Sequence, residues 1–310
     1  MNNKYRSLLD KLATLQNNVL SGKVNCIPSP FPRFNEDFVG IEHGKTIIVS
    51  ANSKVGKTQL TNYMFVYNPL FYAFKNPDKV RIKILYFNLE ETEENITLRF
   101  ISHLLFAHPE LQIPTVRIGT KDLKSTYANK PLSNEVLNVL KNNENFTKIM
   151  DFYYKCVEFR PERHPTGIKK AIESFLLENG TIHYKKIKLV DKETGRTEEI
   201  NAFDYYEPKD PDLYIIPIVD HFALLNSESG LSTKQTMDLM SAYFVKLRNR
   251  YNITPVEVIQ QAAEMESTEN FKQKRLRPTA QGIGESKTLV RDRTQFIFIY
   301  ALLFYNDRIY

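Results

Sequence analysis

The stretch VSANSKVGKTQL, residues 49–60, limits the possible folds of this chain more than any other feature. An apolar segment typical of a buried strand, KTIIVSA, leads into it, and a segment typical of a helix, KTQLTNYMFVY, follows. A strand, a loop ending in Gly-Lys-Thr and a helix form a phosphate-binding loop, in which backbone N–H groups at the start of a helix face phosphates. The motif therefore predicts an α/β domain that binds a nucleotide.

This loop differs from the usual pattern, G-x-x-x-x-G-K-[ST], at its first position, where Ala51 replaces a glycine. A small residue can occupy the exit of the strand if its φ angle stays negative. Lys57 can reach the β- and γ-phosphates, and the Thr58 hydroxyl can bind Mg²⁺. We expect the nucleotide to be held by the residues of the loop: Ala51, Asn52, Ser53, Lys54, Val55, Gly56, Lys57 and Thr58.

Strand-like and helix-like segments alternate along the chain, which predicts a mostly parallel sheet with helices on both faces. The later strand-like segments are 80–90, 212–220, 254–261 and 294–305, and the helix-like ones are 91–106, 166–180 and 232–251. Gly180 is expected to cap the second of these helices. A turn at 192–195 between two further strands predicts a β-hairpin insertion near 181–207. Residues 109–163 fit no single pattern.

The N-terminal region predicts a helix that is separate from this domain. Apolar residues recur at helical spacing over residues 5–20, and the segment 26–32 contains three prolines. An isolated helix of this length is marginal in water, so its apolar face must dock on another surface. We therefore divide the chain into an N-terminal linker helix with its tether, residues 1–26, and a nucleotide-binding domain, residues 27–310.

Composition restricts the setting of the protein. Hydrophobic residues make up 42% of the 310 residues, yet no apolar run is long enough to span a membrane. The chain begins without a signal-peptide core, and Cys26 and Cys156 lie far apart, which favours a reduced, intracellular location. We expect a cytoplasmic protein, for which the cytoplasm of a virus-infected bacterial cell is one setting. The histidines do not cluster, and no zinc signature is present.

Basic residues gather near the C-terminal end of the chain. The net charge of +6 is mild, but seven lysines and arginines lie between Lys272 and Arg293, where only Glu285 and Asp292 oppose them. This distribution suits a polyanion, and the alternative is a solvated loop.

Three polar residues follow predicted strands and could act on a bound triphosphate. Glu90 could polarise the attacking water; the alternative is an acid at the start of a helix, which is the role we expect for Glu91. Asp220 could hold Mg²⁺ through water, or could be a plain acid at the end of a strand. Gln261 could sense the γ-phosphate, or could be a solvent-facing amide in a loop.

In this order the residues resemble the ATPase domain of DnaB-type replicative hexameric helicases, over roughly residues 27–305. The stretches that carry the resemblance are the phosphate loop with the segment before it, ILYFNLEET, YIIPIVDHFALL, ITPVEVIQQ and RPTAQGIGES. The resemblance implies a RecA-like P-loop NTPase domain over residues 27–310, in which an initial alanine in the loop is frequent. It implies catalytic roles for Glu90, Lys57 and Gln261, and a metal site at Thr58 and Asp220.

The same resemblance implies ATP and Mg²⁺ as cofactors and an ATP-dependent DNA helicase that moves along single-stranded DNA as a homo-hexameric ring. The alternative is a RecA-like DNA-binding ATPase, or an accessory protein of a helicase, without unwinding activity. A primase or a helicase loader is the further partner that it implies. The DNA-binding residues would be Lys274, Arg275, Arg277, Gly284, Glu285, Ser286 and Lys287.

The sequence also departs from this family. Pro217 removes a ladder hydrogen bond within the strand that leads to Asp220. Gly284 stands where the family has an arginine, and Thr294 replaces one residue of an acidic pair. The family's N-terminal primase-interacting domain has no counterpart, and the sequence stops before the strand that carries an arginine finger, so we expect an incomplete C-terminal end. The helix at 5–20 corresponds to one that docks on the adjacent subunit.

Overall fold

A single parallel sheet forms the centre of the protein. The computed structural model describes residues 3–108, 111–125, 131–190, 197–262, 267–272, 277–283 and 295–299. Six strands lie in the order β10-β3-β9-β8-β4-β5, and each neighbouring pair is parallel. They are β3 (Ile47–Ala51), β4 (Arg81–Asn88), β5 (Val157–Arg160), β8 (Leu213–Asp220), β9 (Val256–Gln260) and β10 (Gln295–Ile299). The predicted α/β class with a mostly parallel sheet is confirmed.

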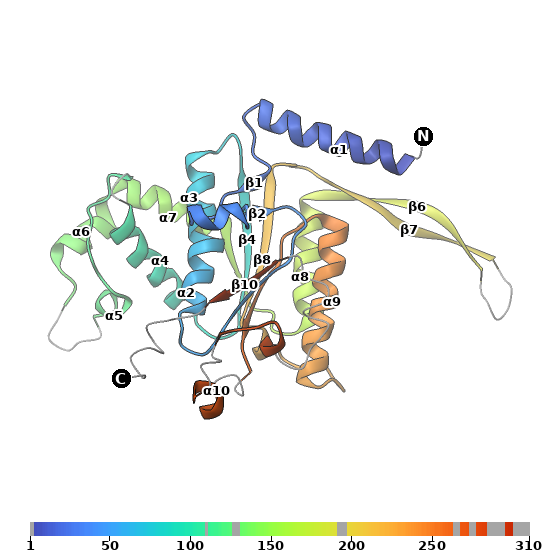
Figure 1. The fold of residues 1–310 in the computed structure, drawn as a ribbon. Helices are drawn as coiled ribbons and strands as arrows, with labels where there is room; N and C mark the ends of the chain where they lie inside the picture. The colour runs from blue at the N-terminus through green and yellow to red at the C-terminus, as the bar shows by residue number, and fades with distance from the viewer. Residues whose placement is uncertain are drawn as a thin grey trace.

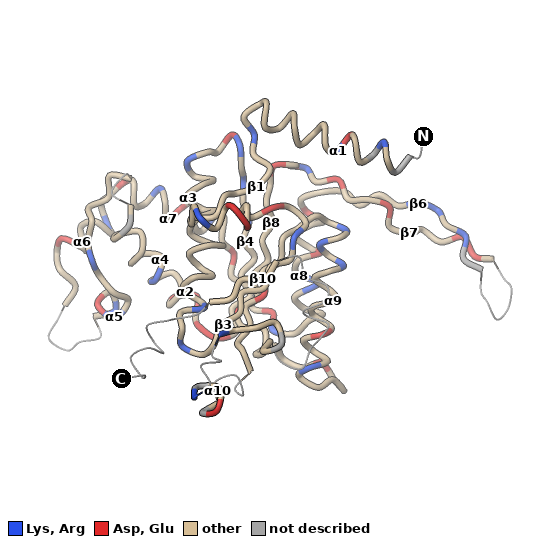
Figure 2. Tube along the Cα trace, viewed as in Figure 1, with Lys and Arg blue, Asp and Glu red and all other residues tan. Residues whose placement is uncertain are grey.

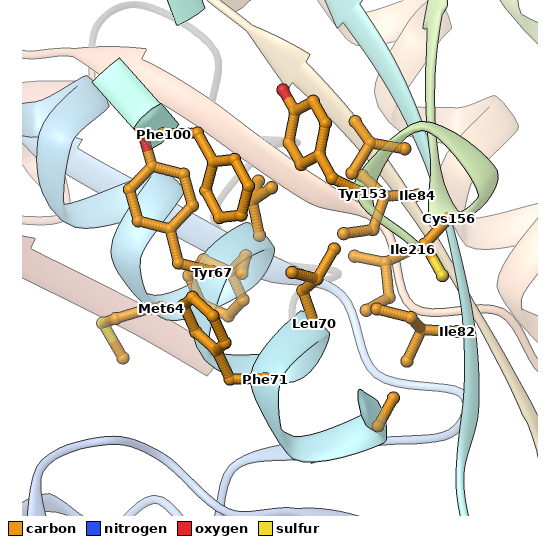
Figure 3. Packing of buried hydrophobic residues seen from close by; sticks show 14 of the residues in the cluster. Met64, Tyr67, Leu70, Phe71, Ile82, Ile84, Phe100, Tyr153, Cys156 and Ile216 are labelled. Carbon is orange, nitrogen blue, oxygen red and sulfur yellow. The ribbon is translucent and has the colours of Figure 1, made fainter. Parts of the chain in front are cut away.

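One face of the sheet is covered by helices from the first half of the chain (Figure 1). These are α2 (Lys57–Asn62), η2 (Tyr63–Tyr67), α3 (Asn68–Lys75), α4 (Glu93–Ala107), α6 (Asn134–Asn142) and α7 (Glu144–Cys156), with a short α5 (Thr120–Leu123). Aromatic rings fill the space beneath them (Figure 3); Phe100 and Tyr153 stack with 4.4 Å between ring centroids. This face carries the larger apolar core.

The opposite face is covered by α8 (Pro165–Glu178) and α9 (Thr233–Tyr251). A second apolar core lies beneath them and includes Leu85 of β4 and Phe222 of the short helix η4 (Phe222–Leu224). Because both faces of the sheet are buried, its strands read as nearly continuous apolar runs.

Two elements extend from this body. They are α1 (Asn3–Leu20) and an antiparallel hairpin of β6 (Gly180–Val190) and β7 (Thr197–Pro208), which projects away from the sheet (Figure 1). Charges of both signs lie along the hairpin (Figure 2). Its base is fixed by the Tyr206 hydroxyl, which donates to the Leu176 carbonyl at 2.9 Å. The predicted hairpin insertion and N-terminal helix are both present, whereas the predicted turn at 192–195 lies outside the described residues.

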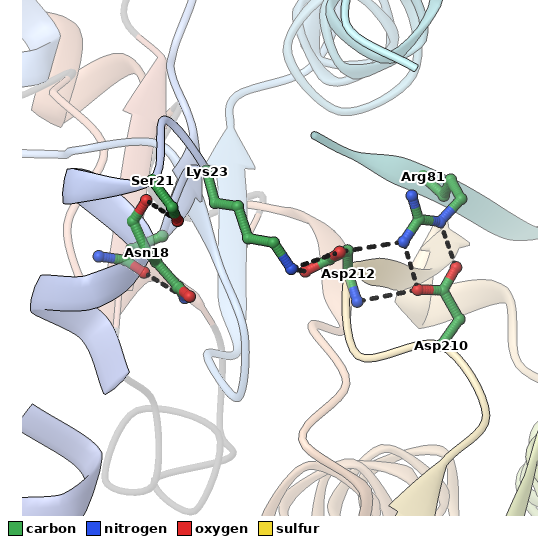
Figure 4. Close-up of polar contacts among 7 residues, drawn as sticks. Asn18, Ser21, Lys23, Arg81, Asp210 and Asp212 are labelled. Atoms are coloured by element: carbon green, nitrogen blue, oxygen red, sulfur yellow. Dashed lines mark hydrogen bonds and ion pairs between the residues drawn. The ribbon is translucent and has the colours of Figure 1, made fainter. Parts of the chain in front are cut away.

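Polar contacts hold the C-terminal end of α1 (Figure 4). The Asn25 amide donates to the Leu15 carbonyl at 2.9 Å. The Lys23 ammonium lies 3.1 Å from the Asp212 carboxylate, which also pairs with Arg81 at the start of β4. The chain then enters the body through β1 (Cys26–Ile27), η1 (Pro32–Glu36) and β2 (Ile41–Glu42), with β1 and β2 paired antiparallel.

Several sequence predictions need correction. Gly180 does not cap α8, because the helix ends at Glu178 and Gly180 is the first residue of β6. A Cβ at Gly180 would lie 2.3 Å from the Tyr206 ring, so the close approach of that ring explains the glycine. The helix predicted at 57–67 instead changes at Tyr63 into a π-helical segment, η2, and then continues as α3.

Other parts of the fold were not predicted from the sequence. The region 109–163 contains α5, α6, α7 and the edge strand β5. Two short helices, α10 (Thr268–Lys272) and η6 (Gln281–Ile283), precede β10. The last predicted strand is present as β10, and the rest of 294–305 lies outside the described residues. Among the described residues no helix is long and apolar enough to cross a membrane.

Pro217 does not interrupt β8. It pairs with Leu85 of β4, whereas β9 pairs with β8 only from Ile218 onward. The proline therefore precedes the part of β8 that has strands on both sides, and Asp220 remains at the end of a regular strand.

Candidate nucleotide-binding site

The phosphate loop lies at the carboxyl end of a completely buried strand. β3 pairs with β9 on one side and β10 on the other, and its last residue, Ala51, is fully buried. Ala51 does not adopt a positive φ, whereas Gly56 has φ of 89°, in the left-handed region that favours glycine. The second glycine of the motif is thus required by the backbone, while the missing first one is not.

Lys57 is the first residue of α2, directly after Gly56. Its side chain is buried, and this burial lowers the pKa of its ammonium group, while Asp220 and Glu90 act in the opposite direction. Both carboxylates that the sequence suggested therefore act on the lysine, although the three residues are far apart in the chain: Lys57 begins α2, Glu90 follows β4 and Asp220 ends β8.

Asp220 is an almost completely buried carboxylate at the end of β8. Burial raises its pKa to about 6, against the effects of Lys57 and of hydrogen bonds from Thr58 and Tyr86. The Tyr86 hydroxyl lies 3.3 Å from Asp220 Oδ2 and 3.0 Å from the Asn62 side-chain oxygen. Among the described residues, Asp220 Oδ1 has no hydrogen-bond partner.

These oxygen atoms fit magnesium in the presence of a nucleotide. Mg²⁺ prefers hard oxygen ligands and is usually held by one or two carboxylates together with phosphate oxygens and water. Asp220 offers the buried oxygen Oδ1, and its carboxylate accepts a hydrogen bond from the Thr58 hydroxyl. No group of three or more His, Cys, Asp or Glu side chains in the described part of the chain could hold a metal by itself. The metal site predicted at Thr58 and Asp220 stays a prediction.

Glu90 lies just beyond the end of β4, and two hydrogen bonds fix the main chain of the residue before it. The Leu89 N–H donates to the Asp220 carbonyl at 2.7 Å, and the Arg163 guanidinium donates to the Leu89 carbonyl at 2.6 Å. The Glu90 carboxylate is exposed and close enough to Lys57 to oppose its loss of a proton. An exposed carboxylate on a fixed backbone is available to contact water.

The neighbouring acid has a different role from the one predicted. Helix α4 begins only after Thr92, whose hydroxyl accepts from the Asn95 N–H, so Glu91 lies before the helix rather than in its first turn. Its carboxylate pairs with Arg99 at 2.7 Å. The Glu91 carboxylate is therefore held in an ion pair with Arg99, whereas the Glu90 carboxylate acts on Lys57.

Gln261 is not a solvent-facing amide. It follows β9 and is buried, and its side-chain nitrogen donates to the Ser50 hydroxyl at 2.7 Å and to the Thr279 carbonyl at 3.2 Å. The Thr279 N–H donates back to its side-chain oxygen at 3.2 Å. Gln261 thus links the strand before the phosphate loop to residues 277–283.

Little of the predicted DNA-binding segment falls within the structure. Arg277 is among the described residues and is exposed. It belongs to residues 277–283, in which Thr279 hydrogen-bonds to Gln261. The remaining residues lie outside the described residues: Lys274, Arg275, Gly284, Glu285, Ser286 and Lys287. Their DNA contacts stay predictions.

Sequence reasoning missed four residues at this site: Asn62, Tyr86, Arg163 and His221. Tyr86 carried a usable signal, because a hydroxyl within an apolar strand needs a buried partner. Arg163 carried none, since its partner is 74 residues away. His221 follows Asp220, and burial, with a further contribution from Lys57, lowers its pKa to about 4, so it is neutral at pH 7.

Comparison with known proteins finds a solved structure with a similar fold. No protein-family model and no curated protein sequence matches this chain. A solved structure of a DnaB-like replicative helicase, described with its interactions with primase, is similar with a TM-score of 0.62 and 13% sequence identity. The match covers 96% of this chain and 57% of the helicase chain, so this chain spans little more than half of that protein. The comparison supports the fold alone, a parallel α/β sheet with helices on both faces.

Proposed function

We propose that this protein is a RecA-like ATPase that works as a replicative DNA helicase. The observation that carries the proposal is that Lys57, Glu90 and Asp220 lie at or just beyond the carboxyl ends of β3, β4 and β8, three parallel strands of one sheet. In open α/β sheets, ligands bind at this edge. A lysine, a buried carboxylate and an exposed carboxylate supply the three functions that hydrolysis of a nucleoside triphosphate needs.

Each of these residues has a distinct part in the proposal. The backbone from Ala51 to Thr58 holds the phosphates, and Lys57 binds the γ-phosphate. Thr58 and Asp220 hold Mg²⁺, which neutralises phosphate charge when it is bound. Glu90 orients the attacking water, and Gln261 senses the γ-phosphate.

Gln261 also provides a route from ATP to DNA. Its amide contacts Ser50 before the phosphate loop and Thr279 beside the basic segment. In the proposal, single-stranded DNA lies along that segment, from Lys274 to Lys287. The chain assembles as a homo-hexamer, with α1 on the adjacent protomer, and a primase or a helicase loader contacts the ring. The similar helicase, whose description includes primase, supports that choice of partner.

The ATP site is tested by binding and turnover. Lys57→Ala should lose ATP binding, because the phosphates lose their buried cation. Lys45→Ala serves as a control, since Lys45 lies before β3 and pairs with Glu42 at 3.9 Å. Equal ATP affinity in the Lys57 variant and the parent would refute the site.

The DNA site is tested by the salt dependence of binding to single-stranded DNA. Neutralising phosphates releases counterions, so binding should weaken steeply with salt. Changing Lys274, Arg275 and Arg277 together to Ala should flatten the slope by about 0.7 for each phosphate that is no longer neutralised. An unchanged slope would move the DNA site elsewhere on the protein.

The second candidate is a RecA-like ATPase that binds DNA or assists a helicase without unwinding. The observation that favours it is the limited coverage, 57%, of the similar helicase. Strand displacement on a forked duplex separates the two candidates. ATP hydrolysis stimulated by DNA without displacement would favour the second.

A further inference from the structure

The two strands of the β6–β7 hairpin carry opposite charges. β6 contains three lysines and no acid, whereas β7 contains four acids and no lysine or arginine. These residues are Lys185, Lys186 and Lys188 on β6, and Glu198, Glu199, Asp204 and Glu207 on β7 (Figure 2). The two-stranded ribbon therefore has a basic strand along one edge and an acidic strand along the other.

Both outer edges of this ribbon lack a neighbouring strand. Among the described residues, β6 and β7 pair only with each other. The base packs on the body through Tyr206 and Phe203, and the outer part projects away from the sheet (Figure 1). An unpaired edge presents a row of N–H and C=O groups to another strand, and a two-stranded ribbon is only marginally stable alone. A further strand on either edge would stabilise the outer part.

The ion pairs within the ribbon leave its charged groups accessible. The Lys185 ammonium lies 2.9 Å from the Asp204 carboxylate, and the Lys186 ammonium lies 3.2 Å from the Glu199 carboxylate. The two lysine side chains are nevertheless 58% and 72% exposed, and their acidic partners are 39% and 50% exposed. Each lysine can therefore meet a second carboxylate that approaches from the open side of β6.

The charge pattern selects which strands can pair. Opposite charges on facing strands are stabilising and like charges are destabilising, so β6 cannot easily pair with another β6, nor β7 with another β7. A second ribbon that lies beside the first in the same orientation places its β7 antiparallel to β6 and brings acids next to lysines. Ile187 and Ile200, which lie opposite each other and are half-buried, would gain apolar neighbours in the enlarged sheet.

The same charges argue against a nucleic acid at this place. Three lysines are set against four acids in the two strands, so the described part of the ribbon carries no net positive charge. A polyanion is attracted to a basic surface, which the ribbon does not provide. A second copy of the chain, in contrast, supplies a matching strand for each edge.

We propose that the hairpins of neighbouring copies pair edge to edge, with the basic β6 of one copy antiparallel to the acidic β7 of the next. Each copy then uses one edge of each kind, so the contact is heterologous and can be repeated from copy to copy around a ring. The inference rests on the proposed function in one respect, since it takes the chain to assemble with copies of itself. It adds a contact surface to the one proposed for α1.

An exchange of charges between the two strands tests the inference. The exchanged chain keeps opposite signs within its own ribbon, and Glu207 stays unchanged because it pairs with His183 at 2.8 Å. Its substitutions are Lys185→Glu, Lys186→Glu, Lys188→Glu, Glu198→Lys, Glu199→Lys and Asp204→Lys. The exchanged chain should associate with itself as the parent does. It should associate with the parent about tenfold to a hundredfold more weakly, because like charges then meet at every junction.

Fluorescently labelled parent, titrated with unlabelled parent or with the exchanged chain, measures these affinities. The matched control exchanges an exposed ion pair on α7, where Lys148 lies 3.8 Å from Glu144. The variant with Lys148→Glu and Glu144→Lys should bind the labelled parent with parental affinity.

Equal affinity of the labelled parent for the parent and for the exchanged chain would overturn the inference, because the hairpin edges would then not meet. Should the exchanged chain fail to fold, crosslinking gives the answer instead. Chains with Lys188→Cys, mixed with chains with Glu198→Cys and a short bifunctional maleimide, should form dimers above the background of the parent. A yield no higher than that background would also overturn the inference.

Failure of the proposed function would be seen separately. A parent that binds no ATP, but discriminates against the exchanged chain, would refute the ATPase and keep the hairpin contact. A parent that stays monomeric at every concentration would overturn both the hairpin contact and the ring. ATP binding by the phosphate loop would still stand in that case, because it is measured on its own.

Discussion

The carboxyl edge of the sheet and helix α1 are built in opposite ways. At the ends of β3, β4 and β8, polar side chains such as Asp220 and Gln261 are buried and contact other side chains of the same chain. Along α1, large apolar side chains are 42–77% exposed, and the contacts that hold the helix are polar. These exposed residues are Tyr5, Leu8, Leu9, Leu12, Leu15, Val19 and Leu20.

The contrast is between polar groups that find their partners within one chain and an apolar face that does not. The buried polar groups of the edge are fixed by several strands of the same chain. Helix α1 has an apolar face for which the described residues offer no cover, and apolar surface of this kind marks a site of association. We therefore expect changes at the edge to alter chemistry, and changes along α1 to alter assembly.

The largest effect should come from Glu90→Gln. The variant keeps the shape of the side chain but loses the carboxylate that faces water, so turnover of ATP should fall about 10²–10³-fold while binding persists. Glu91→Gln is the matched control, because Glu91 pairs with Arg99. Steady-state hydrolysis and equilibrium binding measure the two quantities. If Glu90→Gln hydrolysed ATP at the parental rate, Glu90 would have no catalytic role.

The next effect should come from changing Leu8, Leu12 and Leu15 together to Ala. Alanine preserves helix propensity, so the loss falls on apolar contact area. Each leucine is about half exposed, which gives about 1 kcal/mol per side chain and about a 10²-fold weaker association. Light scattering across a concentration series measures it, with Leu177→Ala on α8 as the control. An unchanged oligomer would show that α1 does not hold the ring.

Removing the buried charge of Asp220 should stabilise the protein without ligand. Its folded pKa of about 6 lies above the ordinary value of 3.8, so its contribution to stability is full below pH 4 and lost as pH rises through 6. Asp220→Asn should therefore gain up to about 3 kcal/mol over the parent at pH 7, and nothing at pH 4. Thermal unfolding at both pH values measures this. Asp210→Asn should behave oppositely, because Arg81 lowers the pKa of Asp210. A lower melting temperature for Asp220→Asn at pH 7 would contradict the account.

A smaller effect is expected at Arg163, which acts through the backbone before Glu90. Arg163→Ala should lower kcat roughly 10-fold and leave KM unchanged, since a displaced catalytic group costs rate more than binding. Arg163→Lys should recover part of the loss. Arg160→Ala is the control, since Arg160 pairs with Glu158 at 3.1 Å. A change in KM alone would assign Arg163 to binding.

The smallest effect should come from Lys23→Ala at the base of α1. Ion pairs that are partly exposed contribute about 0–1 kcal/mol, so the melting temperature should hardly move. The pair with Asp212 nevertheless fixes where the helix leaves the body. A large loss of stability would show that α1 belongs to the core of the chain.

The sequence predicted the parts of the fold whose signals are local. The strand and helix on either side of residues 52–56, β8 and α9 have strong patterns over short ranges, and the structure has each of them. The edge strand β5 was missed because it has four residues and is mostly half-buried, so neither alternation nor a long apolar run marks it.

The contacts of the site could not be predicted, because they join distant parts of the chain. The loop predicted Lys57, but its approach to Asp220 depends on the order of strands in the sheet. The partners of Gln261 are 211 and 18 residues away, so no local pattern indicates its burial. The alternative that Gln261 is a solvent-facing amide is therefore wrong, because the side chain is buried.

The β6–β7 hairpin has a consequence for how force passes through the molecule. Its base is anchored by Tyr206 and by Phe203, which packs on Tyr251, while the outer part is a two-stranded ribbon with exposed lysines and glutamates. Such a ribbon has little stability of its own, and a bulge between His183 and Tyr184 interrupts its ladder. A load applied beyond Lys185 would therefore bend the arm at the bulge before it disturbed α8 or the sheet. We therefore expect a load on the outer part of the hairpin to leave the carboxyl edge of the sheet undisturbed.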